Sequence, residues 1–200
     1  TAPGSIGNIT LTNTGASTLT AADFATVNTG NIAITGGGTN GDITVTTFAN
    51  VSGTVGTLSV TATTGTSDVA FGTGLTGATT VGNITVSQTA ANTVALGVTG
   101  AAGGSIGNVT VSGTGTSFSM STGNVLNIGD ITATGYTGTT AITLAAATLI
   151  GVNFIGGAGA DTFTGTGGAD SISTGGGIDI ITGGLGDDTI TTGALADILH

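Results

Sequence analysis

The sequence of 200 residues contains no lysine and no arginine, so no strongly basic side chain balances its acidic groups. All ten acidic residues are aspartates, and the formal net charge is -10. Proteins bind nucleic-acid phosphates and anionic membrane surfaces mainly through Lys and Arg side chains. The missing cations therefore argue against both kinds of partner. Carboxylates that the fold holds close together must either repel one another or bind an external cation.

Cysteine is also absent, and histidine occurs once, at His200. The lack of cysteine excludes a disulfide framework and thiolate metal sites. The lack of Cys, Lys, Arg and Glu leaves the abundant Ser and Thr hydroxyls without a visible activating base. We expect that this chain is not an enzyme.

Proline occurs once, whereas glycine fills 40 positions. In helices each glycine would cost about 1 kcal/mol relative to alanine, but glycine suits turns between short strands. The most apolar stretch, residues 141–157, is interrupted by Gly and Thr. We expect it to form a buried β segment and no membrane span. Residues 1–9 show no secretory signal.

A loose phrase returns through residues 1–151, in which a turn with glycine is followed by alternating apolar and small polar residues. It reads IGNITLT from Ile6, TGNIAIT from Thr29, NGDITVT from Asn40, VGTLSVT from Val55, VGNITVS from Val81, IGNVTVS from Ile106 and IGDITAT from Ile128. The period of two predicts short strands with one buried face and one Thr/Ser face. Steps in the low to mid twenties favour the coils of a parallel β-solenoid, and the short step from Gly30 to Gly41 fits a second face of one coil. An antiparallel sandwich would look similar.

One position of this phrase is Asn in four copies, at Asn8, Asn31, Asn83 and Asn108, and Asp in two, at Asp42 and Asp130. The position therefore does not require charge. Asn and Asp both tolerate turn conformations, and stacked Asn side chains can form ladders along a solenoid. We interpret it as a structural turn position, and leave open whether Asp42 and Asp130 bind metal.

A second repeat, with a strict period of nine, occupies residues 152–200, which we treat as a second domain. Its copies are GGAGADTFT from Gly156, GTGGADSIS from Gly165, TGGGIDIIT from Thr174, GGLGDDTIT from Gly183 and TGALADILH from Thr192. Each copy has an aspartate at its sixth position and a large apolar residue two positions later. The glycines permit a tight turn lined by backbone carbonyls, and the aspartate adds a carboxylate. Oxygen ligands without nitrogen or sulfur favour Ca²⁺ over transition metals.

The five nonapeptides resemble the RTX (repeats-in-toxin) family. The resemblance implies a right-handed parallel β-roll in which two nonapeptides form one coil and Ca²⁺ lies between turns stacked on the same side. Asp161, Asp179 and Asp197 would then stack on one side and Asp170 and Asp188 on the other, with about three ions between them. The implied metal-binding residues are Gly156, Gly157, Gly159, Asp161, Gly165, Gly167, Gly168, Asp170, Gly175, Gly177, Asp179, Gly183, Gly184, Gly186, Asp188 and Asp197.

Three departures from the repeat weaken particular turns. Thr166 replaces the second glycine of its copy and Thr174 the first, and the last copy has Thr192 and Leu195 where glycines are expected. The site at Asp197 is therefore the weakest of the set. Asp187 lies at a variable position, and we interpret it as solvated.

The composition of residues 1–151 is similar to that of RTX-type surface-layer proteins, which implies a secreted structural subunit at the cell surface that assembles into a lattice or filament with calcium. An anchor to cell-surface polysaccharide would need parts outside this sequence. Two alternatives stay open. One is a module of an RTX adhesin, including ice-binding types that use flat rows of Thr. The other is the calcium-binding tail of a secreted enzyme or toxin.

Overall fold

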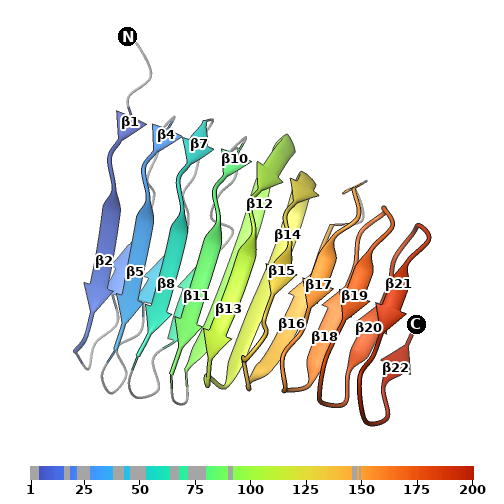
Figure 1. The fold of residues 1–200 in the computed structure, drawn as a ribbon. Helices are drawn as coiled ribbons and strands as arrows, with labels where there is room; N and C mark the ends of the chain where they lie inside the picture. Colours follow the sequence, from blue (N-terminus) through green and yellow to red (C-terminus); the bar gives the residue numbers. More distant parts are fainter. Residues whose placement is uncertain are drawn as a thin grey trace.

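The computed structural model describes residues 5–15, 19–21, 28–37, 43–45, 53–63, 68–71, 80–89, 92–145, 148 and 150–200. Within these ranges the chain contains β-strands and turns but no helix. The described residues therefore include no helical segment that could cross a membrane. All strand pairs are parallel, so the chain winds as a β-solenoid and the antiparallel alternative is wrong. The coils stack from the N-terminal end to the C-terminal end in two layers (Figure 1).

The front layer in Figure 1 is a sheet of nine strands, which we call sheet B. Its first six strands each follow a corner with glycine, as the phrase in the sequence predicted. The strands are β2 (Ile9–Asn13), β5 (Ile32–Gly36), β8 (Leu58–Ala62), β11 (Ile84–Gln88), β13 (Val109–Gly113), β15 (Ile131–Thr132), β17 (Asn153–Ile155), β19 (Ser171–Ser173) and β21 (Thr189–Thr191).

The second layer is a sheet of 13 strands, which we call sheet A. Early coils contribute one short strand before the corner and one strand after sheet B. The strands are β1 (Ser5–Ile6), β3 (Leu19–Ala21), β4 (Asn28–Thr29), β6 (Ile43–Val45), β7 (Thr54–Val55), β9 (Asp68–Phe71), β10 (Thr80–Val81), β12 (Thr93–Ile106), β14 (Ser117–Ile128), β16 (Thr139–Thr143), β18 (Asp161–Thr164), β20 (Ile180–Thr182) and β22 (Ile198–Leu199). The phrase from Asn40 forms β6 in sheet A, so it is the second face of a coil.

After the second coil, the coils become shorter along the chain. Equivalent residues are 26 positions apart at Asn31 and Thr57, 22 apart at Asn108 and Asp130, and 18 apart at Asp161 and Asp179. Strand pairing nevertheless runs on across residue 151, because β15 pairs with β17 and β16 with β18. The two repeat systems therefore share one continuous pair of sheets, and the division into two domains stays a prediction.

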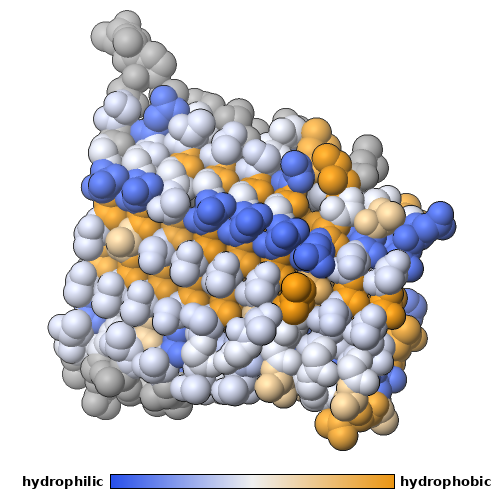
Figure 2. Space-filling view, viewed as in Figure 1, coloured by the Kyte–Doolittle hydropathy of each residue, from blue (hydrophilic) through white to orange (hydrophobic). Residues whose placement is uncertain are grey.

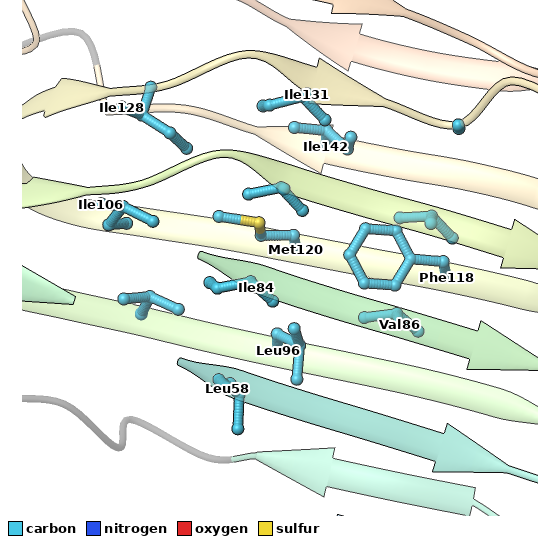
Figure 3. Close-up of a cluster of buried hydrophobic side chains, with 14 of the residues drawn as sticks. Leu58, Ile84, Val86, Leu96, Ile106, Phe118, Met120, Ile128, Ile131 and Ile142 are labelled. Atoms are coloured by element: carbon cyan, nitrogen blue, oxygen red, sulfur yellow. The ribbon is translucent and has the colours of Figure 1, made fainter. Parts of the chain in front are cut away.

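Apolar side chains from both sheets fill the space between the layers (Figure 3). Leu58 and Ile84 of sheet B and Phe118 and Ile142 of sheet A have no more than 1% of their surface exposed. The core continues into the shorter coils, where the rings of Phe154 and Phe163 stack with centroids 4.4 Å apart. The period-two alternation thus gives one core that extends from Ile32 to Ile181.

The Gly-Asn corners form a ladder along one edge of sheet B. The side chain of Asn8 accepts a hydrogen bond from the N–H of Asn31 at 2.9 Å, and Asn83 likewise accepts from Asn108 at 3.0 Å. The side-chain oxygen of Asn8 lies where a Cβ of Gly30 in the next coil would stand, so glycine is required before the asparagine. Figure 2 shows the ladder as a blue line across this face. This confirms the turn-ladder interpretation.

Candidate metal centre

The nonapeptides fold as five turns of six residues that connect the last strands. They comprise residues 156–161, 165–170, 174–179, 183–188 and 192–197, and each ends at the start of a strand or one residue before it. Successive turns lie on alternate sides of the solenoid because each strand between them crosses from one side to the other (Figure 1). Every second turn is therefore stacked on the same side.

Hydrogen bonds between aspartates show which turns stack. The N–H of Asp161 donates to Oδ1 of Asp179 at 2.8 Å, and the N–H of Asp179 donates to Oδ1 of Asp197 at 3.0 Å. On the other side, the N–H of Asp170 donates to Oδ1 of Asp188 at 2.9 Å. The structure thus brings together the same pairs of aspartates that the RTX resemblance implied.

The carboxylates of the first three turns are more deeply buried than those of the last two. Asp161, Asp170 and Asp179 have 1%, 3% and 0% of their surface exposed, whereas Asp188 and Asp197 are half-buried. Neighbouring strands of a sheet lie about 4.8 Å apart, so carboxylates in adjacent coils are close enough to repel. Burial of several like charges without a basic side chain is unfavourable unless a cation joins them.

Asp179 carries the clearest sign of a missing partner. Its Oδ2 is the one buried side-chain oxygen or nitrogen in the described part of the chain that has no hydrogen-bond partner. A buried carboxylate oxygen without a donor costs more than an ordinary unmade hydrogen bond. A divalent cation with a preference for oxygen would satisfy it.

Backbone carbonyls can supply the remaining ligands of such an ion. The described residues form no group of three or more acidic or histidine side chains, so an ion between two turns would have at most two carboxylates. Ca²⁺ accepts six to eight oxygens, including backbone carbonyls, in a flexible shell. The residues present therefore fit Ca²⁺, with the stacked aspartates as its charged ligands.

The predicted glycines lie where the turns approach one another. Gly177 has a φ of 114°, and a Cβ there would clash with the carbonyl oxygen of Gly159 in the preceding turn. The other glycines predicted to bind metal occupy equivalent places in the turns: Gly156, Gly157, Gly165, Gly167, Gly168, Gly175, Gly183, Gly184 and Gly186. Their role as carbonyl ligands stays a prediction.

Asp161 has an altered proton affinity. Burial, which is the largest effect, raises the pKa of the Asp161 carboxyl from 3.8 to about 6. The hydroxyl of Thr140 and the N–H of Gly157 lower this pKa, and the charge of Asp179 raises it. A cation that binds this carboxylate would therefore compete with a proton below about pH 6.

The two other aspartates whose surroundings the structure describes, Asp130 and Asp187, give no comparable cluster. Asp130 is exposed at the end of the asparagine ladder, where its N–H donates to Asn108 at 3.1 Å. Asp187 is exposed, which agrees with its interpretation as a solvated residue. Asp42 lies outside the described residues, so whether it binds metal stays open.

Sequence reasoning missed two hydroxyl groups that touch the aspartates. Thr140 donates to Oδ1 of Asp161 at 2.7 Å, and Thr166 donates to Oδ1 of Asp170 at 2.9 Å. Thr166 had been considered only as a departure from glycine. Thr140 precedes the nonapeptides, and only its place in the stack shows that it contacts one of their aspartates.

Comparison with known proteins agrees with this geometry. A family model for the RTX calcium-binding nonapeptide repeat, in four copies, matches residues 153–181 and 164–199. No curated protein and no solved structure matches the chain. RTX repeats bind calcium and form β-rolls in proteins that are generally secreted. Residues 153–199 are therefore RTX calcium-binding nonapeptide repeats.

Proposed function

We propose that this chain is a calcium-dependent structural module of a secreted cell-surface protein, and that it serves as a subunit of a surface-layer lattice. The observation that carries the proposal is the stack of buried aspartates without a protein cation, with the unpartnered Oδ2 of Asp179 at its centre. This stack continues a long solenoid whose core is filled with side chains. Such a body is suited to bearing load, and calcium would hold its aspartate-bearing coils together.

Calcium would couple folding to export. In a cytosol low in calcium the aspartates repel one another, and the glycine-rich turns lose much conformational entropy on folding. Millimolar extracellular calcium matches the weak affinities typical of extracellular modules, and binding free energy becomes folding free energy. The C-terminal coils would therefore leave the cell extended and fold outside it.

The partner in such a lattice would be a second copy of the chain, with any polysaccharide anchor outside these residues.

Negative-stain microscopy of the purified chain with calcium and with EGTA tests the proposal. We expect ordered sheets or filaments with calcium and dispersed particles with EGTA. Asp179→Asn should prevent the calcium-induced assembly, because it removes a charged ligand at the buried position. Asp187→Asn is the matched control, since it removes the same charge from an exposed site. Equal assembly with calcium and EGTA would contradict the proposal.

A second candidate function is a module of an adhesin that binds a regular surface. The repeats are unequally spaced in the sequence, which argues against regular rows of threonine. The strands of sheet B nevertheless pair in unbroken register, so the differences in coil length lie outside them. The outward positions are in register and form two rows: Thr10, Ala33, Ser59, Thr85, Thr110 and Thr132 in one, and Thr12, Thr35, Thr61, Ser87 and Ser112 in the other. Figure 2 shows this face as pale rows of weakly hydrophilic side chains.

Neighbouring side chains within a row lie about 4.8 Å apart, which is the spacing between strands, and the two rows lie about 6.6 Å apart along each strand. A crystalline ligand with a matching repeat, such as ice, would suit this face. An ice-recrystallisation assay tests the idea, with Thr85→Leu in the row and Asn108→Leu in the neighbouring ladder as control. Loss of inhibition in the first variant alone would favour the adhesin; no inhibition by the unmodified chain would contradict it.

The third candidate is the calcium-binding tail of a secreted enzyme or toxin. It requires a catalytic domain outside these 200 residues. The only histidine, His200, is exposed, and its N–H donates to the carbonyl of Ile181 in the last coil. We propose that the chain itself catalyses no reaction, and hydrolase and protease assays of the purified chain would test this.

A further inference from the structure

The first nonapeptide turn on each side of the roll stacks on the coil that precedes the repeats. The N–H of Ala158 donates to the carbonyl of Tyr136 at 2.9 Å. In the next turns of the same stack, Gly176 donates to Gly157 at 3.0 Å and Ala194 to Gly175 at 3.4 Å, by the same relation. The turn that contains Tyr136 therefore lies directly before the turn of Asp161 in this stack, and Thr137 donates to the carbonyl of Gly113 at 3.2 Å in the coil before it.

The turns on the opposite side of the solenoid also stack on the coil that precedes the repeats. The N–H of Gly167 donates to the carbonyl of Thr148 at 2.8 Å, as Leu185 does to Thr166 at 3.1 Å one coil later. The N–H of Val152 donates to Oδ1 of Asp170 at 2.7 Å, as the N–H of Asp170 does to Asp188. Val152 thus occupies the place that an aspartate occupies in each repeat.

Residues 135–155 form the coil in question, which we call the neutral coil because it contains no ionisable acid or base other than Tyr136. On one side its aspartate position is Thr140, which is in register with Asp161. On the other side it is Val152. The family match starts at residue 153, so it leaves residues 135–152 of this coil unassigned.

The first pair of aspartates has hydrogen-bond donors both from the neutral coil and from the turns to which the aspartates belong. Oδ1 of Asp161 accepts from the hydroxyl of Thr140 at 2.7 Å, and Oδ2 accepts from the N–H of Gly157 at 3.1 Å. For Asp170, Oδ1 accepts from Val152 and from the hydroxyl of Thr166, and Oδ2 accepts from the N–H of Thr166 at 2.8 Å. All four oxygens have a donor within the chain.

Asp179, one coil further on, differs at the second position of its turn. Gly157 and Thr166 do not have a positive φ, and their N–H groups point to the carboxylate of their own turn. Gly175 has a φ of 93°, and the Oδ2 of Asp179 has no donor. A hydrogen bond to a charged carboxylate is stronger than one between neutral groups, so the carboxylates of the two kinds of coil differ in what stabilises them.

We propose that the coil of Asp161 and Asp170 folds on the neutral coil without calcium, and that calcium controls only the coils from Thr174 onward. The neutral coil is then a permanent template that separates a folded solenoid from a calcium-switched end. The inference rests on the proposed function in that calcium is the ion. Loss of calcium would unravel the chain from its C-terminus, and the unravelling would stop near Ser173.

Hydrogen exchange with mass spectrometry on the full chain, in EGTA and in calcium, tests separately whether residues 153–173 fold without calcium and whether calcium folds the later coils. In EGTA we expect protected amides in residues 153–173 and rapid exchange in residues 180–199. Rapid exchange of both segments together in EGTA would overturn the inference. Added calcium should protect residues 180–199. Failure of calcium to do so would contradict the proposed calcium function, whatever residues 153–173 show in EGTA.

Thr140→Asp tests the template directly. It places a carboxylate one coil from Asp161 and removes the hydroxyl donor, so β18 should lose its protection in EGTA and regain it with calcium, and one more Ca²⁺ should bind per chain. Thr143→Asp adds the same charge at an exposed position of the same strand and should leave β18 protected in EGTA. Unchanged protection of β18 in Thr140→Asp would overturn the inference.

Discussion

The N–H of Asp161 donates to Oδ1 of Asp179 across 18 residues of sequence, so each aspartate side chain in the roll reaches back to the preceding coil. The asparagine ladder runs the other way, because the side chain of Asn8 accepts from the later residue Asn31. The reversal occurs between Asp130 and Asp161, where the neutral coil lies. At Asp179, Oδ1 takes the backbone bond, and this leaves Oδ2 to a cation.

The stability of the calcium-free chain should depend on pH through Asp161. Burial raises the pKa of its carboxyl to about 6, so the folded state holds the proton more tightly than the unfolded state. The stability from this group is complete below about pH 4 and is lost as the pH rises through 6. In EGTA we expect a higher urea midpoint at about pH 5 than at about pH 7.5.

Asp161→Asn serves as the control for this pH effect, because its side chain is neutral at both pH values and the difference in midpoint should shrink. In the unmodified chain, protons should also compete with calcium, and calcium affinity should fall as the pH decreases through 6. A midpoint that rises from pH 5 to pH 7.5 in EGTA would contradict the role of Asp161.

Leu195→Gly should stabilise the last coil. Leu195 has a φ of 83°, a conformation that costs a residue with a Cβ about 1 kcal/mol. Its side chain is 73% exposed, so little burial is lost. We expect calcium-induced folding, followed by circular dichroism, to occur at lower calcium concentration. Leu185→Gly is the matched control, since Leu185 is 71% exposed and does not have a positive φ; the same shift in both variants would contradict relief of strain.

Thr57→Asn should close a gap in the asparagine ladder. Asn31 accepts from the N–H of Thr57 at 3.0 Å, but the threonine side chain makes no equivalent bond to Asn83. An asparagine there could accept from the N–H of Asn83, and we expect about 0.5–1 kcal/mol of added stability in urea unfolding. Asn83→Thr opens a second gap and should lower stability by a similar amount. A stability change of the same sign in both variants would show that the ladder does not matter.

Much of this fold could be predicted from the sequence because the residues that specify it repeat. The Gly-Asn corner recurs since the asparagine of one coil fills the space above the glycine of the next, as Asn8 does for Gly30. The period of nine likewise fixes which aspartates stack. A repeated local constraint leaves a repeated pattern, and the pattern can be recognised without coordinates.

The neutral coil and the buried polar contacts could not be predicted in this way. Thr140 and Val152 occupy aspartate positions without sharing the chemistry of aspartate, and the step from Thr140 to Asp161 is 21 residues, compared with 18 in the repeats. Gln88 and Tyr136 are 48 residues apart and occur outside any repeat. Only the stacking of the coils brings such residues together.

Tyr136 and Gln88 form a buried pair in the region where the coils become shorter, and its loss should destabilise the solenoid. The hydroxyl of Tyr136 donates to Oε1 of Gln88 at 2.6 Å, and Nε2 of Gln88 donates to the carbonyl of Ser117 at 3.1 Å. Burial raises the pKa of Tyr136 to about 12, so the hydroxyl remains a donor across the working pH range.

Tyr136→Phe leaves Oε1 of Gln88 buried without a donor, and we expect a loss of about 1–3 kcal/mol in urea unfolding followed by circular dichroism. Gln88→Leu should cost a similar amount, because it leaves the hydroxyl and the carbonyl of Ser117 unpaired. The double variant should be less destabilised than the sum of the two, since removing both partners leaves fewer unpaired groups. Strict additivity would mean that the two side chains stabilise the solenoid independently and that their hydrogen bond contributes nothing.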